Sequence, residues 1–226
     1  MRSNLVTEAD TQSEMLIRSI VAAQFPDDAV LGEEAGQSGS GTGHRWIVDP
    51  LDGTTNFAHG YRCFCVSIAY EHEGVVEFGV VYDPMADEEF TARRGQGASC
   101  NGSALRVSEQ EELRDALLAT GFPAYKVGEL QSNLYPFADF AMNAQALRRD
   151  GSAALDLCYV ASGRFDGFWE PSLQSWDIAA GALIVQEAGG RVTDYAGAPH
   201  VLEGAQVVAS NGKIHAAMLA VLKRYA

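Results

Sequence analysis

Asp49 and Asp52 are the residues of this sequence whose type and spacing most directly indicate a ligand-binding site. Residues 46–48 form a short apolar run that predicts a buried strand ending at Asp49, and open α/β sheets bind ligands at the carboxyl ends of their strands. Gly53 allows a ligand to approach the backbone, and residues 54–55 could present amide groups at a helix start. The segment therefore offers oxygen ligands to a hard cation and donors to an anion. An Asx-type turn followed by a threonine cap explains the same residues.

Four further acidic residues could add ligands, although each also has a structural explanation. Glu33 and Glu34 follow the strand-like residues 29–31, which is typical of a solvated acidic turn. Asp177 and Asp10 each lie near an expected helix start, where aspartate is commonly a cap.

Other catalytic classes have less support in the sequence. Cys100 and Arg106, and again Cys158 and Arg164, have the spacing of cysteine-dependent phosphatases. Cys158 falls within an expected helix, and Cys100 precedes an Asn-Gly turn, so neither is expected to form a phosphate loop. The histidines lack zinc-ligand spacing, and the sequence contains no Walker loop or G-x-S-x-G motif.

Composition limits the remaining possibilities. The chain has 226 residues, of which 47% are apolar, so we expect one domain over residues 1–226 with a substantial core. Its 30 acidic and 16 basic residues give a net charge of −14, which disfavours nucleic acid as a partner. No apolar run long enough for a membrane helix and no signal peptide is found, and the four cysteines are expected to be mostly buried free thiols. A cytoplasmic protein with no membrane partner is expected.

The expected elements alternate in layers. Helical spacing of apolar residues predicts helices over residues 13–25, 130–142, 153–160, 178–188 and 213–224. Strand-like runs cover residues 46–48, 63–70, 75–82, 88–92, 165–169 and 207–209, and residues 38–43 are expected to be a loop. The strands over residues 63–92 are predicted to form an antiparallel meander. The pattern favours an α/β or α+β sandwich.

Two segments resemble the signatures of the inositol monophosphatases, within the magnesium-dependent, lithium-sensitive phosphatase superfamily. The first is DPLDGTTNF at residues 49–57, and the second is WDIAAG at residues 176–181 with EAGG at residues 187–190. Residues 32–34 and 5–10 match two further blocks in the family's order. The resemblance covers nearly the whole chain. It implies an αβαβα five-layer sandwich of the inositol monophosphatase and fructose-1,6-bisphosphatase type, usually a homodimer, that hydrolyses a phosphate monoester with two or three Mg²⁺ ions.

The resemblance also implies a set of metal ligands. Glu33, Asp49 and the carbonyl of Leu51 would hold one Mg²⁺, and Glu33 would also touch a third, weaker ion. Asp49, Asp52 and Asp177 would hold the second ion, with Asp49 bridging. Two such metals stabilise both the attacking and the leaving oxygen of an in-line displacement.

The remaining roles follow from the same resemblance. Thr54, paired with Asp10, would orient or deprotonate the attacking water, and these two with Glu33 make up the expected catalytic set. The amides of Gly53 and Thr54 would bind the phosphate. Hydroxyl groups of the substrate would be bound by Glu170 and by the backbone at Gly151, Ser152 and Ala153.

Departures from the family leave several alternatives open. Family members usually carry a further helical segment before the block that begins here at residue 4, so a shortened N-terminus is expected, and Asn4 stands where aspartate is common. Residues 54–57 favour inositol monophosphate, but sugar phosphates, histidinol phosphate and nucleotides remain alternative substrates. A regulatory role is the rival from another class, since some bacterial relatives act on transcription or ribosome assembly through protein contacts.

Overall fold

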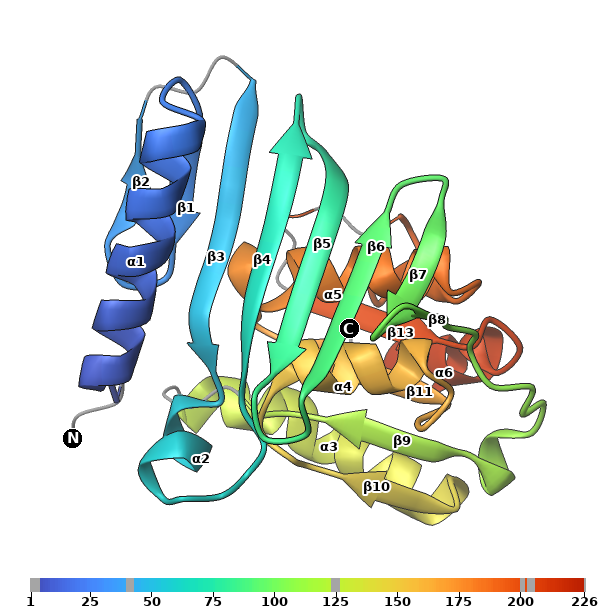
Figure 1. Cartoon of the computed structure of the whole chain (residues 1–226). Helices are drawn as coiled ribbons and strands as arrows, with labels where there is room; N and C mark the ends of the chain where they lie inside the picture. The colour runs from blue at the N-terminus through green and yellow to red at the C-terminus, as the bar shows by residue number, and fades with distance from the viewer. Residues whose placement is uncertain (1–4, 40–42, 123–126, 200–201, 203–205, 226) are drawn as a thin grey trace.

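A strongly twisted sheet of eight strands dominates one half of the molecule (Figure 1). Its strands are ordered β2-β1-β3-β4-β5-β6-β7-β8. They comprise β1 (Ala29–Gly32), β2 (Gly36–Ser38), β3 (His44–Asp52), β4 (Cys65–His72), β5 (Val75–Asp83), β6 (Glu88–Arg93), β7 (Gly97–Cys100) and β8 (Ser103–Ala104). The structure is a computed structural model that describes the chain apart from residues 1–4, 40–42, 123–126, 200–201, 203–205 and 226.

A second sheet of five strands lies behind the first. Its order is β10-β9-β11-β13-β12, for β9 (Leu117–Thr120), β10 (Ala146–Arg148), β11 (Gly167–Pro171), β12 (Arg191–Thr193) and β13 (Gln206–Ser210). β9 pairs in parallel with β10 and β11, whereas β13 is antiparallel to both of its neighbours.

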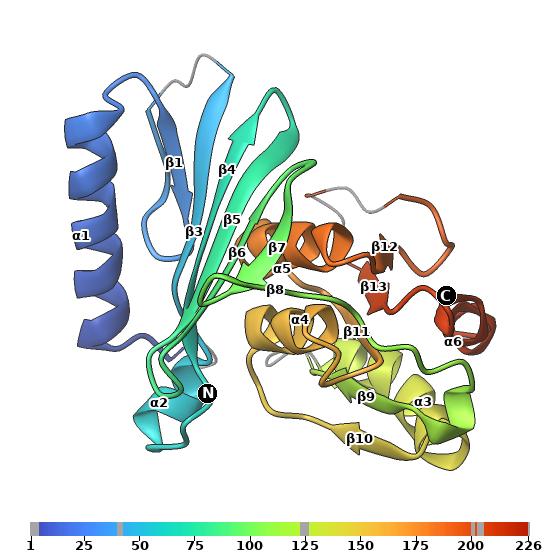
Figure 2. The ribbon, with the colours of Figure 1, turned by 45° about the vertical axis from the view of Figure 1, so that its right-hand side comes forward.

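Helices separate and cover the two sheets, as Figure 2 shows from the side. α1 (Glu8–Gln24) covers the outer face of the first sheet, and α4 (Ala153–Ala161) and α5 (Ser175–Glu187) lie between the sheets. α3 (Val127–Asn143) and α6 (His215–Leu222) lie outside the second sheet, and the short helices are α2 (Thr54–Ala58) and η1 (Leu113–Asp115). The layers thus follow the order αβαβα, which confirms the predicted fold class.

The main core fills the space between the first sheet and the two middle helices. α5 is buried on all sides, in agreement with its apolar run IAAGALIV, because it contacts strands of both sheets. Gly79 of β5 permits this close packing, since a Cβ there would lie 2.9 Å from the Cα of Ala180. No helix in the described ranges is both long and apolar enough to cross a membrane.

The differences from the sequence-based elements concern boundaries and short strands. The antiparallel meander β4–β5–β6 is confirmed. The first helix begins at Glu8 rather than at residue 13, because the Thr7 hydroxyl and the Asp10 carboxylate form a capping box. The predicted strand over residues 165–169 lies at Gly167–Pro171, and the strands β2, β7, β8, β9, β10 and β12 were not predicted. Of the expected loop, residues 40–42 lie outside the described part, as does Asn4.

Candidate functional site

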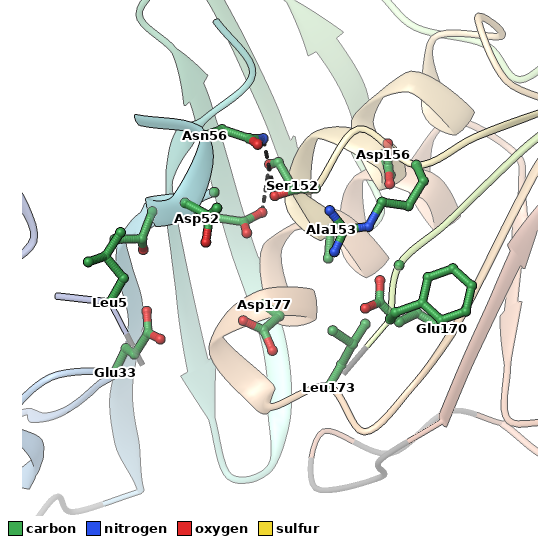
Figure 3. Close-up of a pocket in the computed structure, with 17 residues that line it drawn as sticks. Leu5, Glu33, Asp52, Asn56, Ser152, Ala153, Asp156, Glu170, Leu173 and Asp177 are labelled. Atoms are coloured by element: carbon green, nitrogen blue, oxygen red, sulfur yellow. Dashed lines mark hydrogen bonds between the residues drawn. The ribbon is translucent and has the colours of Figure 1, made fainter. Parts of the chain in front are cut away.

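A cavity of about 230 Å³ opens where the carboxyl end of β3 meets the start of α4 and α5. Its lining contains most of the acidic residues that the sequence singles out (Figure 3). The predicted site residues in the lining are Glu33, Asp52, Gly53, Thr54, Gly151, Ser152, Ala153, Glu170 and Asp177. The other three predicted site residues, Asp10, Asp49 and Leu51, are buried next to it.

A bulge at the end of β3 sets the positions of the two motif aspartates. The pairing of β3 with β4 shifts register between Asp49 and Asp52. The Asp49 carboxylate is 1% exposed and accepts the N–H of Leu51 at 2.9 Å. Asp52 reaches across to α4, where it accepts the hydroxyl of Ser152 at 2.7 Å and the N–H of Ala154 at 2.8 Å. These bonds fix Asp52 relative to the middle helices.

The parallel pairing of β1 with β3 brings Glu33 to the same place. Gly32 is opposite Val48, so the turn after β1 lies beside the end of β3, and the Glu33 N–H donates to the carbonyl of Val48 at 3.2 Å. Glu14 of α1 anchors this turn by accepting the N–H groups of Glu34 and Ala35 at 2.8 and 3.1 Å. Glu14 was not predicted as a site residue, because a single acidic residue in a helical segment forms no recognisable motif.

Asp177 joins the cluster from the first turn of α5. Its carboxylate accepts the N–H of Gln174 at 2.7 Å, in a capping box that also engages the Gln174 side chain. The residue is therefore a helix cap and at the same time lines the cavity. Figure 3 shows Glu33, Asp52 and Asp177 around one end of the cavity.

The pKa values of the carboxylates at this end are raised. Burial is the first cause for each group, and repulsion between carboxylates adds to it for Glu33, Asp49 and Asp177. The pKa of Glu33 is raised to about 7 by burial and by the charges of Glu34 and Asp52. The pKa of Asp52 is raised to about 6 by burial, and those of Asp49 and Asp177 lie well above the ordinary value. A bound cation would relieve this repulsion.

The donor set fits a hard divalent cation such as Mg²⁺, because every side chain offered is a carboxylate. No three His, Cys, Asp or Glu side chains of the described ranges are gathered into a complete coordination group. Mg²⁺ does not require one, since it is commonly held by one or two carboxylates and completed by water and substrate phosphate.

Thr54 connects the cavity with a buried acid of α1. Its hydroxyl lies 3.1 Å from Asp10 Oδ1 and 3.1 Å from the carbonyl oxygen of Leu51. The other oxygen of Asp10 accepts the N–H of Thr7 at 2.8 Å and so caps α1. The structure thus brings Asp10 and Thr54 together, although they are 44 residues apart in the chain. Gly53 directly precedes Thr54 and has a φ of 92°. A Cβ at this position would lie 2.8 Å from the carbonyl oxygen of Cys63.

The opposite end of the cavity comes from the loop before α4 and from β11. Asn56 of α2 fixes this loop, since its amide donates to the carbonyls of Asp150 and Cys63 at 2.7 Å each. Arg149 and Asp156 also line this end of the cavity, and neither was predicted as a site residue from the sequence. The only signal for Asp156 is a carboxylate within the otherwise apolar helix AALDLCYVA.

The cysteines take no part in the cavity. All four are free thiols, and Cys63, Cys65 and Cys158 are buried, as the sequence analysis expected. Burial raises the pKa of each of these three thiols, which disfavours a thiolate nucleophile.

Comparison with known proteins gives one consistent family. The sequence profile described as "Inositol monophosphatase family" matches residues 2–225. A protein of Pseudomonas aeruginosa named "Nus factor SuhB" is 47% identical over 96% of this chain and 82% of its own length. A Rhizobium meliloti protein named "Inositol-1-monophosphatase" is 44% identical over 98% of this chain and 84% of its own length.

Solved structures agree with the sequence comparison. An inositol monophosphatase from Anabaena superposes with a TM-score of 0.93 at 42% identity, covering 98% of this chain and 88% of that one. The extragenic suppressor protein suhB from Bartonella henselae gives a TM-score of 0.92 at 44% identity, covering 97% and 86%. The chain therefore belongs to the inositol monophosphatase family and is a phosphoric monoester hydrolase.

Proposed function

We propose that this protein releases inorganic phosphate from myo-inositol monophosphate in a reaction that needs Mg²⁺ and is inhibited by lithium. The observation that carries the proposal is the convergence of Glu33, Asp52 and Asp177 from three separate segments on one cavity. Burial raises the pKa of all three, and repulsion from neighbouring carboxylates adds to the shifts of Glu33 and Asp177. A pure binding module has no need of such a cluster.

The ligands follow the signature segments. Glu33, Asp49 and the Leu51 carbonyl would hold one Mg²⁺, and Asp49, Asp52 and Asp177 a second, with a third ion near Glu33. When bound, the ions lower the pKa of a water and neutralise charge on the attacking and leaving oxygens.

Thr54 and Asp10 would orient the attacking water. When the Thr54 hydroxyl donates to Asp10 Oδ1, its oxygen lone pair is free to accept a proton from the water. Because Asp10 Oδ2 is held by the N-terminus of α1, the carboxylate cannot turn away from Thr54.

The substrate would span the cavity from end to end. The amides of Gly53 and Thr54 would receive the phosphate, and Glu170 with the backbone of Gly151, Ser152 and Ala153 would bind the hydroxyl groups of the alcohol. Related sugar phosphates, histidinol phosphate and nucleotides are the alternative substrates within the family.

Further properties belong to the same proposal. We propose that residues 1–226 form one domain, that the protein is a cytoplasmic homodimer, and that its partner is a small phosphate ester rather than nucleic acid or a membrane. The net charge of −14 supports the exclusion of nucleic acid. A regulatory, protein-binding role is the second candidate, favoured by the relative named "Nus factor SuhB".

The test is phosphate release from myo-inositol 1-phosphate with excess Mg²⁺, with EDTA and with added lithium. Release that EDTA and lithium both abolish would support the proposal. Release that persists in EDTA would contradict the metal mechanism. If no ester is cleaved while a partner protein still binds an Asp49→Asn variant, the regulatory role is favoured instead.

A further inference from the structure

The cavity has two acidic ends with different surroundings. Glu33, Asp52 and Asp177 lie at one end, and Asp156 and Glu170 lie at the other, as Figure 3 shows. Among the described residues that line the cavity, Arg149 carries the only positive charge. It acts electrostatically on both carboxylates of the second end. Nothing in the proposed mechanism uses Asp156.

Asp156 is a buried carboxylate with one unpaired oxygen. It projects from α4, is 1% exposed, and its Oδ1 has no hydrogen-bond partner in the described part of the chain. Leaving a buried polar group unpaired destabilises the folded state, so a purely structural role would favour an apolar residue here. Asp156 also lines the cavity, so its carboxylate lies beside the space that a ligand would occupy.

Glu170, by contrast, is fixed by the protein. It is 8% exposed, and the N–H of Gly121 donates to its carboxylate. A Cβ at position 121 would overlap that carboxylate, so a side chain here would displace it. Asn133 holds the adjoining segment by donating to Thr120 Oγ1 at 2.9 Å and accepting the indole N–H of Trp169 at 2.6 Å.

These two acids are acceptors that suit hydroxyl donors. Burial raises the pKa of both acids; the charge of Glu170 raises that of Asp156 further, the charges of Asp177 and Asp52 raise that of Glu170, and Arg149 lowers both. The positive charge of Arg149 near both acids disfavours a further metal ion at this end of the cavity. Adjacent hydroxyl groups of a polyol can donate to several carboxylate oxygens at once.

We propose that Asp156 is a specificity-determining residue, which accepts a hydrogen bond from a hydroxyl of the alcohol beside the one bound by Glu170. The enzyme would thereby prefer phosphate esters of polyhydroxylated alcohols to esters whose alcohol has no free hydroxyl. The inference rests on the proposed function, and it adds a residue and a basis for discrimination to it.

The experiment compares two esters, myo-inositol 1-phosphate and phenyl phosphate, on the wild-type protein and on Asp156→Ala and Asp156→Asn. Loss of one hydrogen bond to a charged acceptor is expected to lower kcat/KM for the inositol ester about 10- to 100-fold in Asp156→Ala, mainly through KM. The value for phenyl phosphate is expected to change less than about twofold. Asp156→Asn, which keeps one acceptor oxygen, is expected to lie between.

A structural role predicts a different pattern. The matched control is Asp83→Ala, since Asp83 is a buried aspartate outside the cavity whose carboxylate accepts the N–H groups of Met85 and Ala86 at 2.8 and 3.1 Å. We expect this control to lower the melting temperature without changing the ratio of the two esters. Both Asp156 variants are expected to melt at or above the wild-type temperature, because they remove an unpaired buried charge.

Equal losses on both esters, or an unchanged ratio in Asp156→Ala, would overturn the inference while leaving the proposed phosphatase intact. If wild-type protein cleaves neither ester, the proposed function fails, and calorimetric binding of myo-inositol 1-phosphate in Mg²⁺ decides the inference. Weaker binding by Asp156→Ala than by wild type would then support it, and equal or undetectable binding to both would overturn it.

Discussion

At the scale of single residues, Asp49 gives the sharpest prediction. Asp49→Asn keeps the side-chain volume and the oxygen that accepts the Leu51 N–H, but it removes a charge from the cluster. We expect phosphate release to fall by about 10³-fold, because the variant loses a carboxylate that we propose as a ligand of both metal ions. The metal-free melting temperature is expected to stay or rise, because a buried repulsive charge is gone. Unaltered turnover would refute the metal assignment.

Thr54 gives a second prediction at this scale. Thr54→Ala removes the hydroxyl that connects the cavity to Asp10, and kcat is expected to fall about 10²- to 10⁴-fold. Thr54→Ser keeps that hydroxyl and serves as the matched control, with most of the activity retained. Steady-state kinetics with inositol 1-phosphate check both variants. Similar losses in the two would mean that the methyl group, and not the hydroxyl, matters.

The residues of the site differ in how far the sequence revealed them. Asp49 and Asp52 were predicted because they share one short segment at a strand end. Glu14 and Asp156 were not, since their importance depends on tertiary contacts, namely the turn after β1 for Glu14 and the cavity wall for Asp156. Local spacing predicts residues that act from one segment, whereas residues that complete a site from another layer leave no local pattern.

At the scale of elements, His215 links α6 to the second sheet. Its imidazole is fully buried, with Nδ1 2.8 Å from the Ser210 hydroxyl and Nε2 2.9 Å from the Thr193 hydroxyl. Burial, and then the charge of Arg191, lowers the pKa of His215 from 6.5 to about 4. The unfolded chain therefore binds more protons than the folded one between these values, so stability is lost as the pH falls from about 6.5 to 4.

Protonation of His215 in the unfolded chain is expected to lower the unfolding free energy by up to about 3 kcal/mol over this pH range. Denaturant unfolding at pH 7 and at pH 4.5 measures it. His215→Gln keeps a donor and an acceptor but does not titrate, so its stability is expected to change less between the two pH values. An equal change in both proteins would assign the acid sensitivity to other groups.

The elements also show what apolar spacing can and cannot predict. The first helix was predicted from Met15, Leu16 and Ile20, yet these side chains are 67%, 62% and 48% exposed, and the buried positions are Asp10, Glu14 and Val21. Periodicity therefore predicted that a helix exists but not which face packs on the sheet. The short strands β10 and β12 were missed because three residues carry too little pattern.

At the scale of the whole molecule, the site joins the two halves of the sandwich. The first sheet supplies Glu33, Asp49 and Asp52, whereas the middle helices supply Asp156 and Asp177, and β11 of the second sheet supplies Glu170. The layer order was predictable only through the resemblance to a family, since the pairing of β9 with β11 joins segments far apart in the chain. A ligand bound in this cavity contacts both halves and must stabilise them together.

Divalent cation binding is consequently expected to raise the stability of the whole fold. Mg²⁺ at 100 times its Kd should add about 2.7 kcal/mol to the unfolding free energy, which corresponds to a rise in Tm of about 5–10 °C. Differential scanning calorimetry with Mg²⁺ and with EDTA, at equal ionic strength, measures it as a shift of one transition. Asp49→Asn is the control that should lose the shift, because it lacks a carboxylate that we propose as a metal ligand. A wild-type Tm that does not respond to Mg²⁺ would show that the carboxylate cluster holds no cation in the folded protein.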